Sequence, residues 1–478
     1  MRAPGHHRRV VVVALSSLIT VLLLLGWFLA DIGDVVPGPL TVHNVQSRAL
    51  SAAPAVRSSI GLVRAADLSA TVSAKAVASA ISTFGSASGL GDDYSVAVSQ
   101  ADGTIVGGHD ADVARQPAST LKILTALAAA SRLDMGSTLD TTTYLDSGES
   151  RSGTPTVILK GNGDMLLSSG DNDPEHINGR AGLRSLASLT AKALRSRGVT
   201  TVRLAVDDTL FGSVRSPAHV GENNDGGLYF TPISSLAVDG GRQWASGKAP
   251  TNPDVFDDYP TLSTTTASGA ASVFVARLKE QGIKVEGQIS SATAGSGLTS
   301  LATVHSATLT EIMAFMLRHS DNTLAEEFGR LLALKMRTGN SPTGAVTAVE
   351  RVLRSLKIPL TGLTMADCSG LSPGSRVTVR TLVAVQEMNL GAHGVAAAAE
   401  GLSVSGLMGT AKDRFGDSGV NGLLRVKTGS LSDVTSMAGT VSTKSGGVLA
   451  FAVVVNNPKD YESARAAIDS LGVALAGL

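Results

Sequence analysis

A nearly continuous apolar run, VVVVALSSLITVLLLLGWFLA, occupies residues 10–30 and follows a short basic segment. A helix needs about 20 apolar residues to span a bilayer, so this run is long enough. A cleaved signal peptide would have a shorter apolar region, and Phe28 stands where a small residue is wanted if cleavage follows Ala30. We therefore predict a single-pass signal anchor in the cell membrane, with residues 1–9 as a cytoplasmic head and the catalytic part exported. A cleaved signal peptide and a buried helix are the alternatives.

Alternating apolar and polar positions first appear in YSVAVSQADGTIVGGH, residues 94–109, where two runs flank a turn at Asp102-Gly103. A period of two around a Gly-containing turn is typical of a β-hairpin. Residues 31–80, which precede it, are rich in Ala, Ser and Val and show only loose helical periodicity. We interpret them as a linker and a leading helix.

The middle of the chain, residues 140–304, is rich in Gly, Ser, Thr and Asp, and its apolar positions come in short runs. Three runs are typical of strands, TVILKG (156–161), TVRLAVDD (201–208) and VEGQISS (285–291), and LRSLASLTAKALRSRG (183–198) is typical of a helix. This stretch is predicted to be an α+β insert of one or two domains.

Helical periodicity returns in LTEIMAFMLRHSDNTLAEEFGRLLALKMR, residues 309–337. Thr308 and Glu311 have the T-x-x-E spacing of a capping box, which marks the start of a helix. The polar residues at 320–322, Ser-Asp-Asn, divide the stretch into two predicted helices.

The end of the chain predicts strands and a closing helix. LLRVKTGSLSDVTSMAGTVSTKSGGVLAFAVVVNN (423–457) has strand-like runs with a turn at 444–447, and the last segment (460–478) is helical in pattern. Helices before and after antiparallel strands predict an α+β fold, an antiparallel sheet flanked by helices. We find no internal repeat.

Charge and cysteine content narrow the function classes. Lys+Arg and Asp+Glu both number 40, so no charge excess indicates nucleic acid as a partner. The single cysteine, Cys368, excludes an internal disulfide, and neither it nor the nine histidines have the spacing of metal ligands. The segment DNDPEH (171–176) lacks the Gly of a calcium loop and is predicted to be solvated. We expect no cofactor and no metal.

Ser119 and Lys122 are the first candidates for chemistry, because they lie one helical turn apart in the apolar segment PASTLKILTAL. A lysine whose pKa is lowered by burial and by a nearby cation can take the hydroxyl proton of such a serine. Pro117 is expected to start the helix, which would place Ser119 where backbone N–H groups stabilise an oxyanion. Taken alone, S-x-x-K is a common coincidence, and a surface lysine is the simpler interpretation.

Two further motifs change that judgement. SDN at 320–322 lies between apolar helices, and KTG at 427–429 lies on an apolar strand. In this order and in these contexts, S-x-x-K, S-D-N and K-T-G form the signature set of penicillin-binding proteins and class A β-lactamases. A long insertion separates the first two motifs here.

From about residue 85 to its end, the chain resembles the class C low-molecular-mass penicillin-binding proteins, which are D-alanyl-D-alanine carboxypeptidases and endopeptidases. The resemblance implies a penicillin-binding catalytic domain made of residues 81–139 and 305–478, with residues 140–304 inserted. Other family-like stretches are LKGNGDMLL (159–167), FTPISSLAVDGGR (230–242), DCSGLS (367–372) and SVSGLMGTAKDRF (403–415). Two positions depart from the family pattern: Cys368 replaces a usual glycine, and no proline follows the Asp of GNGD. We interpret Cys368 as a small buried residue.

The resemblance implies a role for each motif residue. Ser119 resembles the acylated nucleophile, and Lys122 resembles the base that activates it. Ser320 matches the residue that relays a proton to the leaving amine, and Asn322 matches the amide that binds the peptide group of the substrate.

The third motif is implied to bind the end of the substrate. Lys427 resembles the cation that attracts the terminal carboxylate and lowers the pKa of its neighbours, and Thr428 resembles a hydroxyl that binds this carboxylate. The backbone N–H groups of Ser119 and Ser430 would form the oxyanion hole. Gly429 is expected to let the substrate approach as an added strand.

The expected function is therefore a serine carboxypeptidase that acts on peptidoglycan peptides ending in D-Ala-D-Ala and is acylated by β-lactam antibiotics. A β-lactamase is one alternative, although the sequence has no E-x-x-x-N for the deacylating water near the expected position. An inactive cell-wall scaffold or sensor is the other. The preference for carboxypeptidase or endopeptidase activity, the role of the insert and the oligomeric state stay open.

Overall fold

The computed structural model describes residues 5–32, 66–146, 153–391, 395–416 and 418–478. The chain divides into two units, Met1–Ala65 and Ala66–Leu478. The described part of the first unit is one helix, α1 (Gly5–Ile32). Its segment Val11–Ile32 is long and apolar enough to cross a membrane, judged by length and composition. The predicted apolar helix is thus confirmed as a helix, whereas most of the predicted linker lies outside the described residues.

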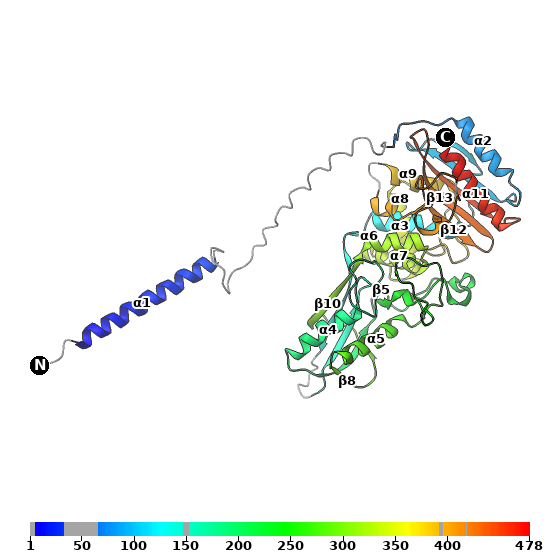
Figure 1. The fold of residues 1–478 in the computed structure, drawn as a ribbon. Coiled ribbons are helices and arrows are strands. Elements are labelled where there is room, and N and C mark those ends of the chain that lie inside the picture. Colours follow the sequence, from blue (N-terminus) through cyan, green and yellow to red (C-terminus); the bar gives the residue numbers. More distant parts are fainter. Residues whose placement is uncertain (1–4, 33–65, 147–152, 392–394, 417) are drawn as a thin grey trace. The chain divides into compact units, whose positions relative to one another are not determined.

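The second unit contains a six-stranded sheet in which every neighbouring pair is antiparallel (Figure 1). β1 and β2 form the predicted hairpin, with Gly103 in the left-handed region at its turn. In spatial order the strands are β11 (Ser403–Val404), β12 (Leu424–Leu431), β13 (Val434–Ser442), β14 (Val448–Asn456), β1 (Tyr94–Gln100) and β2 (Ile105–His109).

The two faces of this sheet bury different side chains. One face presents larger side chains such as Phe451 and Val453 to α2 (Ala74–Gly85) and α11 (Tyr461–Ala476). The other presents small ones such as Ala438 and Ala452 to a layer of helices. Small side chains allow a helix to approach the sheet closely, which is how the segment carrying Ser119 comes against β12 and β13. The leading helix predicted within residues 31–80 corresponds to α2, which extends past residue 80.

The helical layer contains α3 (Lys122–Ala130), α6 (Leu309–His319), α7 (Asn322–Met336), α8 (Pro342–Ser355), α9 (Val379–Leu390) and α10 (Ala396–Glu400). The predicted capping box at the start of α6 is confirmed, since the Thr308 and Glu311 side chains each bond the other's backbone N–H. The predicted break is confirmed as well. Ser320 adopts the left-handed conformation after α6, and the Asp321 carboxylate accepts from the N–H of Leu324 to cap α7.

A second sheet occupies the middle of the chain, with mixed strand directions. Its order is β10 (Thr299–Thr308), β3 (Thr138–Asp146), β4 (Thr156–Gly161), β6 (Thr201–Asp207) and β8 (Lys284–Val285), and β9 (Ser290–Ser291) also pairs with β6. The helices α4 (Leu183–Arg195) and α5 (Thr266–Glu280) pack together over it and close its apolar core (Figure 1).

The predicted strand in residues 285–291 is only partly right, because β8 and β9 are two-residue strands separated by residues 286–289, which are not strand. The predicted strands at 156–161 and 201–208 and the helix at 183–198 are confirmed. β3 begins at Thr138 and β10 ends at Thr308, both just outside the predicted insert. The division into a catalytic domain and an insert stays a prediction, since residues 66–478 form one compact unit.

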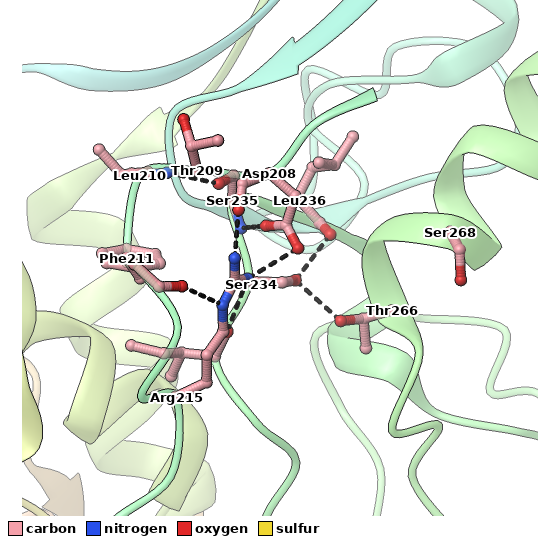
Figure 2. Close-up of polar contacts among 12 residues, drawn as sticks. Asp208, Thr209, Leu210, Phe211, Arg215, Ser234, Ser235, Leu236, Thr266 and Ser268 are labelled. Carbon is pink, nitrogen blue, oxygen red and sulfur yellow. Dashed lines mark hydrogen bonds and ion pairs between the residues drawn. The ribbon is translucent and has the colours of Figure 1, made fainter. Parts of the chain in front are cut away.

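The long connections between β6 and α5 are fixed by a polar network around Asp208 (Figure 2). Arg215 Nη1 donates to Asp208 Oδ2 over 2.7 Å, and the backbone N–H of Ser235 donates to the other carboxylate oxygen over 2.6 Å. The Ser234 hydroxyl pairs with that of Thr266 on α5 at 2.8 Å. These contacts fix the residues directly before β7 (Leu236–Val238), which pairs with β5 (Asp164–Leu167).

Candidate active site

Ser119 lies on a tight turn ahead of the helix that carries Lys122. Residues Ala118–Leu121 form a 3₁₀ turn, η1, which begins directly after Pro117 and runs into α3 at Lys122, so the expected helix start at Pro117 is confirmed, with a 3₁₀ first turn. Ala118 is left-handed, with φ 49°, a conformation that costs a non-glycine residue about 1–2 kcal/mol. The Ser436 hydroxyl donates to the Pro117 carbonyl over 2.7 Å and helps to hold the turn. The strain at Ala118 therefore accompanies a fixed orientation of Ser119.

The Lys122 amine is fully buried and has three oxygen partners. It contacts Ser119 Oγ at 2.8 Å, Asn322 Oδ1 at 2.6 Å and the Ser369 carbonyl at 2.9 Å. Burial lowers the pKa of Lys122 to about 7, while the carboxylates of Asp367 and Asp321 act in the opposite direction. The amine is thus neutral in a substantial fraction of molecules at neutral pH, which is what a base requires.

Lys427 and Ser320 form a second buried contact beside the first. Lys427 Nζ donates to Ser320 Oγ over 2.9 Å and to the Thr428 carbonyl over 2.7 Å. Burial, and next the positive charge of Lys122, lower the pKa of Lys427 well below its ordinary value. A positive charge on Lys122 therefore disfavours a positive charge on Lys427.

β12 presents the third motif along an edge that is open to the cleft. Among the described residues, β11 pairs only with Val426 and Arg425 of this strand, so the part from Lys427 to Leu431 has β13 on one side alone. The Thr428 hydroxyl donates to the Thr410 hydroxyl over 2.7 Å. An unpaired strand edge is the geometry that accepts an extended peptide.

Gly429 is required for a reason other than the one expected from sequence. A Cβ atom at this position would lie 2.2 Å from Ser436 Oγ, 2.8 Å from the Pro117 carbonyl and 3.1 Å from the Ser119 backbone nitrogen. The missing side chain thus makes room for the turn that carries Ser119, whereas the sequence interpretation assigned that space to a substrate strand.

The loop DCSGLS (367–372) supplies one of the hydrogen-bond partners of Lys122. The Asp367 carboxylate accepts the backbone N–H groups of Ser369, Gly370 and Ser372 at 2.9, 2.6 and 2.8 Å, and this arrangement orients the Ser369 carbonyl toward Lys122. Cys368 is fully buried, as interpreted from the sequence, and burial raises the pKa of its thiol. Its sulfur fills the space beside Gly329, where an added Cβ would be 2.3 Å away.

The motif residues open onto a cleft of about 450 Å³. Ser119, Ser320, Asn322, Thr428 and Ser430 line it, whereas the two lysines lie beneath its floor.

Sequence reasoning missed the aromatic wall of this cleft. Tyr229 and Tyr259 face each other with ring centroids 5.9 Å apart, and the Tyr229 carbonyl accepts from the Asn322 amide at 2.8 Å. Tyr229 directly precedes the family-like stretch 230–242 and could have been found from it, but no pattern marks Tyr259.

Within the described residues, no group of three or more His, Cys, Asp or Glu side chains could hold a metal ion. His319, beside Ser320, is a packing residue: its ring stacks on Phe256 at 4.3 Å, and its Nε2 lies 2.9 Å from the Asp254 carbonyl. The contact between Ser119 Oγ and the buried Lys122 amine offers nucleophilic chemistry.

Known proteins share this chain's sequence and fold over most of its length. Carboxypeptidase DacB of Mycolicibacterium smegmatis is 33% identical over 76% of this chain and 76% of its own length. Carboxypeptidase Rv3627c of Mycobacterium tuberculosis is 31% identical over 87% of each chain. The crystal structure of penicillin binding protein 4 (dacB) from Haemophilus influenzae has the same fold, with a TM-score of 0.65 and 18% identity over 82% of this chain and 97% of that one.

The family model of the D-Ala-D-Ala carboxypeptidase 3 (S13) family matches residues 79–257 and 256–477, which is most of the chain. This confirms the resemblance that the three motifs indicated. The chain belongs to the D-Ala-D-Ala carboxypeptidase 3 (S13) family.

Proposed function

We propose that this protein is a serine D-alanyl-D-alanine carboxypeptidase that cleaves peptidoglycan stem peptides through an acyl-enzyme on Ser119. The observation that carries the proposal is the 2.8 Å contact between Ser119 Oγ and the fully buried Lys122 amine, whose pKa is lowered to about 7. A neutral amine at this distance can take the proton of the hydroxyl that it contacts. Family membership supports the same reaction class.

In the proposed acylation step, Lys122 accepts the hydroxyl proton while Ser119 Oγ attacks the carbonyl carbon of the penultimate D-Ala. The new C–O bond forms as the carbonyl electron pair moves to oxygen, and the backbone N–H groups of Ser119 and Ser430 would hold the resulting oxyanion. Collapse of this intermediate breaks the C–N bond to the terminal D-Ala. The leaving amine needs one proton, which the contact from Lys427 to Ser320 can supply over 2.9 Å.

The terminal carboxylate of the substrate would bind at Thr428 and above Lys427. Before substrate arrives, burial and Lys122 favour a neutral Lys427. A carboxylate at this point favours the charged form of Lys427, and that charge in turn keeps Lys122 neutral. Substrate binding would therefore favour a protonated Lys427 and a neutral Lys122, which leaves Lys122 as the base. Asn322 would bind the peptide group of the substrate from its position at the start of α7.

Hydrolysis of the acyl-enzyme by water returns Ser119 to its free state. A β-lactam would acylate the same serine, but its leaving amine stays tethered and obstructs the approach of water, so the adduct should persist. The structure of the Haemophilus influenzae relative has also been solved in complex with a β-lactam. We propose that a β-lactam binds in the same cleft here and forms its adduct with Ser119.

The apolar helix α1 is proposed to be a retained membrane anchor, with residues 66–478 on the outer side, where peptidoglycan lies. Its segment Val11–Ile32 has a mean hydropathy of 2.5, which is the property that supports this placement. A signal sequence has the same property, so the size of the mature protein in the membrane fraction tests the anchor.

The activity is tested by incubating the full chain, solubilised in detergent, with a pentapeptide ending in D-Ala-D-Ala and with cross-linked muropeptides. We expect release of free D-Ala from the pentapeptide and none from the Ser119→Ala variant, which removes only the nucleophile. Cleavage of the cross-linked substrate would add endopeptidase activity at the same site. Equal product from wild type and Ser119→Ala, or product from neither, would refute the proposal.

A further inference from the structure

Arg242 reaches from the middle of the chain to the centre of the second motif. Its Nη2 donates to Asp321 Oδ2 over 2.8 Å, and the two side chains are only 7% and 12% exposed. The guanidinium also lies over the Phe256 ring, 4.6 Å from the centroid. Water has little access to this ion pair, because the aromatic ring covers the arginine and the turn after α6 covers the aspartate.

Arg242 is itself fixed by residues of its own loop. Its Nη1 contacts Asp239 Oδ1 at 3.3 Å, and the Asp239 carboxylate accepts from Trp244 Nε1 and from Asn178 Nδ2, both at 2.6 Å. Gly240 has a φ of 61°, which favours glycine, and a Cβ there would lie 2.7 Å from the guanidinium and would displace it. These contacts hold the Arg242 guanidinium in one position beside the cleft.

Asp321 divides its two carboxylate oxygens between two tasks. Oδ1 accepts the Leu324 N–H and caps α7, while Oδ2 binds Arg242. The residues on either side are the two that meet the lysines: Ser320 contacts Lys427, and Asn322 contacts Lys122. Ser320 has a φ of 57°, which a non-glycine residue holds only when its surroundings fix it.

We propose that Arg242 is a positioning residue of the reaction: through Asp321 it fixes Ser320 and Asn322 against the two lysines, and it neutralises the carboxylate that Asp321 brings near Lys122. The inference rests on the proposed function of Ser119 and Lys122. It gives the loop around Arg242 a defined part in the chemistry, beyond shaping the cleft.

The charges around this pair set the direction of the expected effect. Lys122 faces Asp367, Asp321 and Lys427. Asp321 in turn faces Arg242 and lies near His319, Tyr259 and Glu327, which come from α6, the cleft wall and α7. Without Arg242, the Asp321 carboxylate would stabilise the ammonium form of Lys122 more strongly. The base would then become available only at higher pH.

The test measures acylation of the full chain in detergent by a fluorescent penicillin, from about pH 5 to about pH 10. Arg242→Gln should lower the second-order acylation rate constant about 100-fold, as a small displacement of catalytic groups does. With the pentapeptide, kcat should fall much more than KM. The rise of the acylation rate with pH should move to higher pH than in the wild type. Arg242→Lys, which keeps the charge, should retain the wild-type midpoint with a smaller loss of rate.

Arg215→Gln is the matched control. Arg215 also forms a partly buried ion pair, with Asp208 at 2.7 Å, in the same stretch of chain but away from the motifs. It should lower the melting temperature without moving the pH midpoint. In an Asp321→Asn background, Arg242→Gln should add less than about a twofold further loss, because the two residues act as one unit.

An Arg242→Gln variant whose pH midpoint matches that of the wild type and of Arg215→Gln would overturn this inference and leave the proposed function standing. A wild-type chain that takes no penicillin adduct on Ser119 and releases no D-Ala would overturn the proposed function and this inference with it. Should Arg242→Gln not fold, Arg242→Lys carries the test, and an unchanged acylation rate in that variant contradicts the inference.

Discussion

The two sheets of the unit Ala66–Leu478 bury their polar groups in opposite ways. Beside the first sheet, Lys122 and Lys427 are fully buried, and each has oxygen partners from distant segments. The core between the second sheet and α4 and α5 is mainly apolar and includes the uncharged pair Thr143 to Thr190, although the carboxylate of Asp207 at the end of β6 is also buried, with Lys160 3.9 Å away. Burying a charge is costly, so buried amines with specific partners beside a cleft are candidates for chemistry. The contrast locates the chemistry at the first sheet.

The second region nevertheless reaches the first through its loops. Arg242 binds Asp321, and Tyr229 binds the amide of Asn322. The loops after β6 thus hold residues of the reaction site in place, whereas the second sheet anchors these loops. Substitutions of the two lysines should therefore abolish activity without unfolding the protein. Substitutions in the polar networks of the second region should lower stability and leave activity intact.

The largest effect is expected for Lys122→Ala. Loss of a general base lowers a rate by about 100- to 10,000-fold, and removal of a buried amine leaves the first sheet itself intact. Pentapeptide turnover by the purified variant, measured beside its thermal unfolding, checks this. A variant that keeps wild-type turnover would show that another group takes the proton of Ser119.

Gly429→Ala should be the next most severe change. The new Cβ would meet the Pro117 carbonyl at 2.8 Å and Ser436 Oγ at 2.2 Å, so the turn that carries Ser119 must move. We expect a loss of acylation rate of about 100-fold and a loss of stability of about 1–3 kcal/mol. Gly198→Ala is the matched control, because it is also a glycine but has open space around its Cβ position. It has a φ of 72°, so some loss of stability is expected there, with normal acylation.

Arg215→Gln should separate stability from activity. It removes one partner of the network around Asp208 (Figure 2), which leaves a partly buried carboxylate unpaired and should cost about 2–3 kcal/mol in the free energy of unfolding. The acylation rate of the folded variant should stay within about twofold of wild type. Denaturant unfolding and penicillin acylation of the same sample measure the two effects. A large loss of acylation would show that the network reaches the active site.

The smallest effect on activity is expected for Glu326→Gln, which changes stability with pH. Glu326 lies on α7, fully buried, and burial raises its pKa to about 8, so the folded state holds a proton that the unfolded state loses near pH 4.5. The stabilising contribution of this group is full below the unfolded pKa and is lost as pH rises through about 8. The variant cannot ionise and should become more stable relative to wild type as pH rises.

Comparing the variant with the wild type at each pH isolates the effect of Glu326. The lowered pKa values of Lys122 and Lys427 change the free energy of unfolding with pH in the opposite sense, but they do so equally in both proteins. At about pH 5 the two chains should have similar free energies of unfolding, and at about pH 9 the variant should be more stable by about 1 kcal/mol or more. A difference that does not change with pH would mean that Glu326 is ionised in the folded protein throughout.

What the sequence could predict follows the same division. Ser119, Ser320 and Lys427 lie in short motifs whose local structure is set by neighbouring residues, such as the caps around α6 and α7, so their elements were predictable. The reason for Gly429 was not, because it depends on how closely η1 approaches β12 and β13. Tyr259 carries no local signal, and Arg242 ends the family-like stretch 230–242 without any pattern that indicates its partner. Their place in the site comes from contacts such as Arg242 with Asp321, which join residues far apart in the chain.

The central claim is that Ser119 is the nucleophile and that neutral Lys122 is its base. Intact-mass measurement of the full chain at timed intervals after addition of penicillin, repeated across pH, tests both parts. We expect one persistent adduct of the mass of the drug, mapped to the peptide that contains Ser119, and we expect it to form faster as pH rises, with a midpoint of about 7. An adduct on another residue, or a rate that does not change between about pH 5 and about pH 9, would contradict it.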